Sequence, residues 1–453
     1  IYYSNKIEVL AKQLAALCHF KPLSPLSAEN IVVESAAMQH WLTDALSKEL
    51  GIVANIQFPF PAALVWKIYR LQMPELAQQS SFDKNALVWR LFALLNDEEF
   101  THHYPQFEKT ALNTYLNCLQ DDVQCLRFCQ QLAGLYDQYQ IYRPDWLLQW
   151  QKGEWVFPNN PTAHWQAHLW RLLCQLEDQQ EDRSAIFERS LKLFPLAKNK
   201  ATEVAQRLNI FAVSTLAKSY LDLFASLGES IEVNVFVLNP CSIFWHDIQT
   251  QKQYSQAGGS QEVLADGHNE LLALLAKQSR EFIELLQEYE RADVHELYVE
   301  NTDLENNSEN ESQASLLQQL QQDILHLRQN ALASQVAKVT LQNSDDSLQI
   351  HSCHSPLREV QVLHDQILQY LQENQSANLD DIAIMVPDLE HYAPFIHAVF
   401  SSQNMDQKIA YHLCERQQSD QGGIKATLLK LLQLSQHQFN RDIVISIMRE
   451  PSV

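Results

Sequence analysis

Residues 136–143 combine, in one short run, the side chains that proteins use to bind single-stranded nucleic acid. Aromatic rings stack on bases, amide, carboxylate and guanidinium groups bond to base edges, and cations neutralise phosphates. The run Tyr-Asp-Gln-Tyr-Gln-Ile-Tyr-Arg contains all of these groups. The alternative is that Tyr139, Tyr142 and Trp146 line a protein core, because their spacing also suits one face of a helix. The pattern therefore predicts either a DNA-contacting helix or the inner face of a helical bundle.

The loop Ser4-Asn5-Lys6 follows a short apolar opening and precedes a helix, which is where many ATPases place their phosphate loop. A phosphate loop needs glycines, because its backbone must wrap closely around the phosphates. The chain has 9 glycines in 453 residues, none before Gly51, and no G-x-x-x-x-G-K-[ST] or G-x-G-x-x-G pattern. Val213 ends a later apolar segment and is followed by Ser214 and Thr215, not by the acidic pair that would hold magnesium. We therefore expect no nucleotide site, although Lys6 alone resembles a phosphate-loop lysine.

Asp388 and Glu390 faintly resemble a nuclease site of the PD-(D/E)xK type. That chemistry needs a second strand that places a lysine beside the metal, and no such lysine follows Glu390. Asp388 is better explained as the N-cap of a helix. The eight cysteines show no C-x-x-C spacing, and Cys125 and Cys129 share one helical face as core residues would. We expect no catalytic residue, no metal site and reduced thiols.

The composition is that of a folded, acidic protein. About 46% of the 453 residues are apolar, and a chain of this length exceeds what one core usually supports, so we expect two or three domains. The net charge of −22 repels a phosphate backbone, so any contact with DNA must be local. No apolar stretch approaches the ~20 residues of a membrane span, and no secretory signal opens the chain. We expect a soluble, cytoplasmic protein that makes no contact with a membrane.

Strands and helices must alternate around these residues at the start of the chain. Apolar segments at 1–3, 31–33, 208–213 and 232–238 are predicted strands, and the amphipathic segments between them predict helices on a parallel sheet. Asn5 and Glu8 suggest a capping box for the first helix. The period is helical nearly throughout 61–194, which predicts an all-helical insertion. Its expected buried anchors are Trp66, Tyr69, Trp89, Leu91, Leu94, Leu132, Leu135, Trp146 and Trp170.

A linker and a second α/β domain are predicted for the rest of the chain. The stretch 296–311 has acidic residues and no basic one, which favours a solvated connection, and a helix is expected over about 315–334. Ser355 and Pro356 predict the N-cap and first position of another helix. Its strands are expected at 348–353, 382–386 and 409–413. The predicted boundaries are 1–60 with 195–295 for the first domain, 61–194 for the insertion, 296–346 for the linker and helix, and 347–453 for the start of the second domain.

Several distinctive stretches follow one another along the chain. They include Tyr2-Tyr3-Ser4-Asn5, Gly51-Ile52-Val53-Ala54-Asn55-Ile56, Phe58-Pro59-Phe60-Pro61-Ala62, Tyr142-Arg143-Pro144-Asp145-Trp146, Asn239-Pro240-Cys241 and Cys353-His354-Ser355-Pro356-Leu357-Arg358-Glu359-Val360. In this order they resemble the RecC family, the gamma chain of exodeoxyribonuclease V. None of them is a generic motif, and together they span almost the whole chain, so their joint occurrence is a specific signal.

The resemblance implies a pair of RecA-like domains of the superfamily 1 helicase type, called 1A and 2A, that lack ATPase motifs. The helical insertion of the first would be 1B-like. The family provides a non-catalytic subunit of RecBCD, an ATP-dependent helicase and exonuclease. There it splits duplex DNA, channels the 3′ single strand and recognises Chi during double-strand break repair by homologous recombination. The implied partners are RecB-like and RecD-like subunits and double- and single-stranded DNA, with ATP, magnesium and nuclease activity on the partner subunits.

The resemblance also carries over residues that are expected to contact Chi. The retained residues are Trp66, Leu135, Asp137, Gln138, Arg143 and Arg183. The residues that differ from the well-studied member are Glu34, Ala36, His40, Phe60 and Gly134. Glutamine both donates and accepts, whereas an ionised glutamate accepts and a histidine depends on its tautomer. The sequence that is read is therefore expected to differ, unless the changes are neutral drift at positions that face water.

Two other functions stay open at this point. One is the inactivated-helicase half of an AddAB-type enzyme, whose nuclease would lie further along the gene. An E-x-K motif with a cysteine cluster there would favour it. The other is a pure assembly scaffold, which crosslinking to a 3′ tail within the assembled complex would exclude.

Overall fold

The computed structural model describes residues 1–24, 26–97, 99–176, 181–193, 205–248, 250, 268–289, 291–300, 315–328, 345–374, 377–401, 409–413, 428 and 431. The chain forms two compact units, residues 1–34 with 38–347 and residues 348–453 with 35–37. The predicted linker beyond residue 300 lies outside the described residues. In the described part of the chain, no helix is long and apolar enough to cross a membrane.

The first unit contains a six-stranded sheet in the order β3-β2-β4-β5-β1-β6, in which all neighbouring strands are parallel. This confirms the predicted α/β class with a parallel sheet. Two of the strands, β3 and β6, were not predicted, because two residues give no recognisable alternation. The strands are β1 (Tyr2–Ser4), β2 (Glu29–Val32), β3 (Ile56–Gln57), β4 (Arg207–Phe211), β5 (Glu232–Leu238) and β6 (His295–Glu296).

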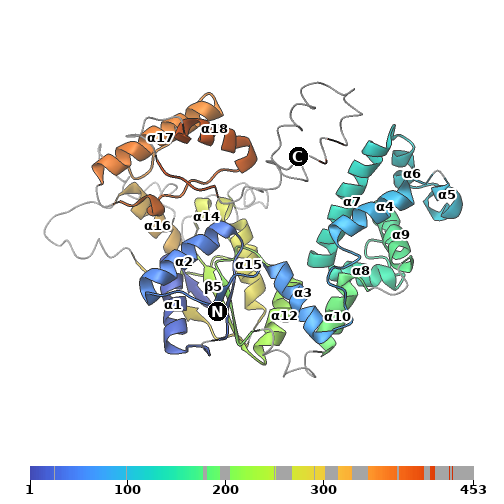
Figure 1. Ribbon diagram of the computed structural model, residues 1–453, viewed down its shortest axis with the longest axis horizontal. Helices are drawn as coiled ribbons and strands as arrows, with labels where there is room; N and C mark the ends of the chain where they lie inside the picture. Colours follow the sequence, from blue (N-terminus) through green and yellow to red (C-terminus); the bar gives the residue numbers. More distant parts are fainter. Residues whose placement is uncertain are drawn as a thin grey trace. The chain divides into compact units, whose positions relative to one another are not determined.

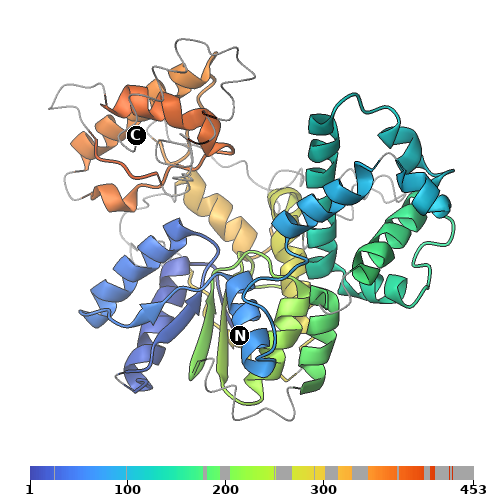
Figure 2. The same cartoon turned by 45° about the vertical axis from the view of Figure 1, so that its right-hand side comes forward.

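Helices cover both faces of the sheet (Figures 1 and 2). Successive residues of β2 point to opposite faces, so that Ile31 belongs to one hydrophobic cluster and Val32 to the other. Leu10 and Leu42 pack in the cluster of Ile31, and Phe224 packs in that of Val32. The first face carries α1 (Ile7–Phe20) and α2 (Ala36–Leu50), and the second carries α3 (Pro61–Gln72), α12 (Lys218–Gly228), α14 (Glu270–Leu275) and α15 (Lys277–Gln287).

Between β3 and β4 the chain forms helices with a core of their own. Tyr136, Trp150 and Trp170 are fully buried there, and Cys125 and Cys129 are buried with them as predicted. Trp89 was expected to be an anchor, but it is 64% exposed, because it lies on the outer side of its helix. The helices of this core are α4 (Lys84–Leu95), α5 (Phe100–His103), α6 (Ala111–Leu116), α7 (Asp122–Tyr142), α8 (Pro144–Gln151) and α9 (Pro161–Gln175). α10 (Arg183–Leu193) follows them, and its Ile186 packs in the cluster of Val32.

The second unit is described mainly by α17 (Pro356–Glu373) and α18 (Leu389–Ser401). Ser355 caps α17 by accepting from the Arg358 N–H, and Asp388 accepts from the His391 N–H at the start of α18, so both predicted caps are confirmed. The strands predicted at 348–353, 382–386 and 409–413 are wrong for the described residues, which contain no strand in this unit. Apolar residues of the second and third segments pack against the two helices without forming a ladder.

Two predictions about helix ends are also corrected. The N-cap of α1 is Lys6 and makes no side-chain cap bond, because Asn5, the predicted cap, bonds to Val299 instead. α14 and α15 are separated by the single residue Ala276. A further helix, α16 (Leu316–Leu325), begins with a capping box at Ser315 as its sequence suggests, but ends earlier than predicted.

Candidate nucleic-acid interface

The carboxyl ends of the strands form the edge at which open parallel sheets bind their ligands. Glu34 follows β2 at this edge, and Ser214 follows β4, the neighbouring strand. The N–H and the hydroxyl of Ser214 both donate to Glu34 Oε1, at 3.0 and 2.9 Å. Glu34 is exposed, as are Ala36 and His40 on α2. The edge therefore presents a carboxylate that has one oxygen engaged by the protein.

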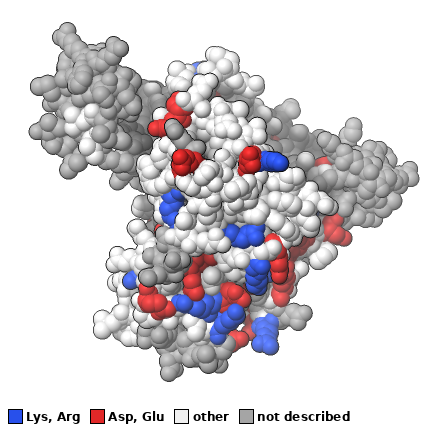
Figure 3. Space-filling model, turned by 90° about the vertical axis from the view of Figure 1, so that its right-hand side faces the viewer, with Lys and Arg blue, Asp and Glu red and all other residues white. Residues whose placement is uncertain are grey.

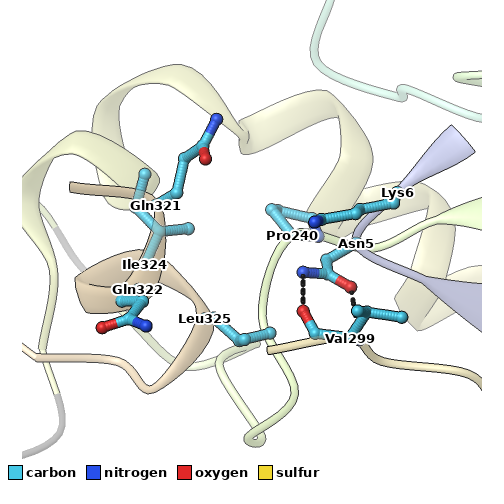
Figure 4. A pocket seen from close by; sticks show the side chains of 8 residues that line it. All are labelled: Asn5, Lys6, Pro240, Val299, Gln321, Gln322, Ile324 and Leu325. Atoms are coloured by element: carbon cyan, nitrogen blue, oxygen red, sulfur yellow. Dashed lines mark hydrogen bonds between the residues drawn. The ribbon is translucent and has the colours of Figure 1, made fainter. Parts of the chain in front are cut away.

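The loop after β1, where an ATPase would hold phosphate, is tied to the segment after β6. Asn5 donates to the Val299 carbonyl at 2.9 Å and accepts from its N–H at 3.0 Å (Figure 4). Ser4 donates to the Leu297 carbonyl at 2.8 Å. The pocket beside the loop holds about 150 Å³, which is below the ~300 Å³ at which small-molecule sites begin. It is lined by Asn5, Lys6, Pro240, Val299, Gln321, Gln322, Ile324 and Leu325.

Arg183, the first residue of α10, joins that helix to α7 and to the start of α4. Its guanidinium donates to Asp137 at 3.1 Å and also bonds to Asp83. The three side chains are 24%, 24% and 32% exposed. Burial raises the pKa of the Asp137 carboxyl, and the charge of Arg183 opposes that rise. The structure thus brings together two predicted DNA-contact residues, which neutralise each other.

Arg143 lies at the junction of α7 and α8. It donates to both oxygens of Asp145, at 3.2 and 3.0 Å, and its guanidinium carbon lies 4.2 Å from the ring centre of Trp146. Trp146 packs on Tyr139, which is partly buried in the helical core, whereas Tyr142 is 56% exposed. The run 136–143 is therefore divided between core and surface, and Arg143 is on the surface with one side of its guanidinium engaged.

Trp66 and Phe60 belong to the region where the chain leaves the sheet. Phe60 precedes α3 and is 53% exposed. Trp66 is partly buried against the core on the α3 side of the sheet, donates from its indole N–H to the Gln78 carbonyl at 2.8 Å, and meets Tyr69 edge to face. Its ring is therefore held in one orientation, and Phe60 is freely accessible.

Gly134, Leu135 and Gln138 line a groove of about 790 Å³ between α4 and α7. Sequence reasoning missed the other lining residues, which come partly from α4. Trp89 was taken as core because its neighbours Val88 and Leu91 are apolar, and the helical period alone does not say which of them faces inward. The missed residues are Lys84, Asn85, Val88, Trp89, Leu126, Arg127, Gln130 and Gln131.

Charged side chains and one group of possible metal ligands lie on the surface of the protein. On the face shown in Figure 3, basic and acidic residues are mixed over the lower part, and a broad area above them carries few charges. Among the described residues, Glu99, His102 and His103 have donor atoms within 4.8 Å of one another, but all three are exposed. His103 already bonds to Asp97 at 3.2 Å, and we assign no metal to this group.

These features define a parallel α/β protein with a helical insertion and exposed aromatic, amide and guanidinium groups suited to nucleic acid. Residues 1–327 match the family model described as RecC, N-terminal domain. The chain is 31% identical to the RecBCD enzyme subunit RecC of Escherichia coli K12 and 30% identical to that of Haemophilus influenzae, in both cases over 100% of this chain and over 42% and 44% of the relatives. The chain belongs to the RecC family. It spans less than half the length of these curated relatives.

Proposed function

We propose that this chain is the non-catalytic part of a RecBCD-type helicase and nuclease, in which it guides the 3′ single strand and recognises Chi. Its relatives are RecBCD enzyme subunits, which supports RecB-like and RecD-like partners and a role in recombinational repair. The observation that carries the proposal is the placement of Leu135, Gln138 and Arg143. Leu135 and Gln138 lie on α7 and Arg143 follows its last residue. Leu135 is partly buried against the helical core, whereas Gln138 and Arg143 are exposed, so an amide and a guanidinium are available to a single strand.

The proposal includes a helicase-like first domain that has lost its nucleotide site. Two observations support this part: the loop after β1 has no glycine, and its Asn5 is bonded to Val299. Backbone N–H groups at the start of α1 are then unable to surround a phosphate. Calorimetry with Mg-ATP tests it, and we expect no binding. A micromolar dissociation constant, equivalent to about −8 kcal/mol, would contradict this part of the proposal.

The test of Chi recognition is Arg143→Ala in the full-length chain, reconstituted with its partner subunits. Arg143 and its partner Asp145 are 48% and 52% exposed, so its removal should leave folding and assembly intact. A lost bidentate contact to a base typically costs about 1–3 kcal/mol, so the response to Chi should fall by roughly tenfold or more. Unwinding and digestion of Chi-free DNA should stay near the native rate, because no motor residue is changed.

A matched control is Arg291→Ala, which removes another exposed arginine, ahead of β6. We expect that variant to respond to Chi normally. If Arg143→Ala also responds normally, the assignment of this segment to recognition is wrong. If it abolishes assembly or all unwinding, Arg143 holds the complex together and the chain acts as a scaffold at this position.

A further inference from the structure

The outer side of the α4–α7 pair holds a groove that the predicted site residues enter at one end. Asn96, just after α4, bonds to Asp122 at the start of α7 at 3.4 Å, and Lys84 at the start of α4 lies beside Gly134. The two helices are therefore antiparallel. That arrangement places Trp89 opposite the part of α7 that carries Arg127 and Gln130. The groove follows α7 from residue 127 to 138, a rise of about 16 Å.

Exposed side chains of three chemical kinds meet in this groove. The indole of Trp89 is 64% exposed and is supported at its edge by Phe92, with ring centres 6.2 Å apart. Gln130, Gln131 and Gln138 recur along one face of α7 and are exposed. Within the described part of the chain, the amides of these three residues make no hydrogen bond. An aromatic ring beside exposed amides is an arrangement that can stack on a base and bond to its edge.

The charge of the groove is opposite to that of the chain as a whole. Its lining includes Lys84 and Arg127 and no acidic residue, although the chain has 55 acidic and 33 basic residues. Among the described residues, neither Lys84 nor Arg127 forms an ion pair. Asp83, next to Lys84, and Asp137 on α7 are both bound by Arg183. Asp122, the α7 carboxylate nearest to Arg127 in the sequence, accepts from Asn96. The groove is therefore a local cationic surface in an acidic protein, which favours an anionic ligand.

Lys84 lies against α7 beside Gly134. A Cβ atom added at Gly134 would lie 3.7 Å from Lys84 Cε and 3.9 Å from its Nζ, which is ordinary contact. A Cβ atom can thus be introduced here without forcing the helices apart. A carboxylate at this position would meet the Lys84 ammonium directly.

We propose that this groove is a stacking subsite for single-stranded DNA. A base stacks on Trp89, Arg127 and Lys84 neutralise phosphates on either side, and the glutamine amides of α7 bond to base edges. The inference rests on the proposed function, because a single strand is the ligand that the chain is proposed to guide. It adds residues that lie beyond the predicted contacts and extends them along α7 away from Arg143.

The test uses the full-length chain in its reconstituted complex and a 3′-tailed DNA whose tail contains 5-iododeoxyuridine. Light should crosslink the tail to Trp89, and peptide mass spectrometry should locate the adduct. Trp89→Ala should remove the adduct and weaken binding of the tailed DNA by about tenfold, the range expected for one lost stacking contact. Arg127→Ala should make the slope of log affinity against log salt concentration shallower by about one, the change expected for one lost phosphate contact.

Matched variants distinguish the effect of a charge or an aromatic ring in the groove from a general loss of folding. Gly134→Asp should weaken binding by pairing with Lys84, whereas the near-isosteric Gly134→Asn should weaken it far less. Phe20→Ala removes an aromatic residue that is 80% exposed at the end of α1, and it should bind like the native chain.

The outcomes distinguish this inference from the proposed function. If no adduct forms at Trp89 and Trp89→Ala binds the tailed DNA with native affinity, the groove is not a subsite for DNA. The proposed function still stands in that case if Arg143→Ala loses the Chi response. Loss of a partner subunit from Trp89→Ala, with crosslinks elsewhere unchanged, identifies the groove as a protein interface and also overturns the inference. If Trp89→Ala binds DNA normally and Arg143→Ala responds to Chi normally, the proposed function is contradicted as well.

Discussion

Arg183 gives the sharpest test of how structure and DNA contact are related in the helical insertion. It holds Asp137 and Asp83, and the three side chains are 24%, 24% and 32% exposed. Removing one partner of a buried ion pair costs about 3–5 kcal/mol, whereas an exposed ion pair contributes about 0–1 kcal/mol. Because the Arg183 cluster is partly buried, Arg183→Ala should lower the free energy of unfolding by about 2–3 kcal/mol. The reason is that two partly buried carboxylates would then face each other without a cation.

The assay is urea unfolding followed by tryptophan fluorescence, because Trp150 and Trp170 report on the core of the insertion. Adding Asp137→Asn to Arg183→Ala should recover part of the loss, since one of the stranded charges disappears. The control is Arg189→Ala on the same helix, whose partner carboxylates are 64% and 42% exposed, and it should cost less than about 1 kcal/mol. If the two arginine variants lose the same stability, burial of the Arg183 cluster has been overestimated and the reasoning fails.

Three further predictions concern the sheet, a buried cap and the sequence that is read. Arg207, 1% exposed, pairs with Glu29, so Arg207→Met should cost about 3–5 kcal/mol in thermal or urea unfolding, and Glu29→Gln added to it should recover part of that loss. Burial raises the pKa of Asp182 above its ordinary value of 3.8. The native chain should therefore gain stability relative to Asp182→Asn as the pH falls from the raised pKa towards 3.8, and urea unfolding of both proteins at a series of pH values would show whether it does. Changing Glu34 and His40 to glutamine should alter which Chi variant stimulates the complex best, and an unchanged preference would point to drift.

The sheet was largely predictable, and the physical reason is visible in its strands. β5 was placed at its observed limits, because seven residues with an apolar majority and turn signals at both ends leave little choice. The strands of the second unit were not predictable in this way. Ile382 and Tyr411 lie in short, mostly apolar segments as strand residues would, but they pack onto α17 and α18. An apolar pattern in the sequence indicates that a residue is buried. A strand also needs a neighbouring strand to pair with, and the pattern does not show whether one is present.

The sequence predicted which residues belong to the candidate site, but it did not predict which of them pair with each other. The sequence indicated Asp137, Arg143 and Arg183 for contact with DNA, but nothing in the spacing showed that Arg183 would neutralise Asp137 across 46 residues. The groove was missed for a related reason. Trp89 lies on α4 and Arg127 on α7, and their common surface exists because the two helices pack antiparallel.

The proposed loss of a nucleotide site and the proposed DNA surface would have a common basis in where the protein makes its internal hydrogen bonds and ion pairs. At the carboxyl edge of the sheet, groups that could bind a phosphate are bonded within the protein: Asn5 to Val299, and Ser214 to Glu34. The insertion shows the reverse arrangement, because the charges of Asp83 and Asp137 are satisfied by Arg183 while Arg127 makes no ion pair with any described residue. A chain with a net charge of −22 can hold a phosphate backbone where its carboxylates are bound internally and its cations are not. On this reasoning we expect the helices of the insertion, and not the sheet edge, to provide most of the binding energy for a single strand.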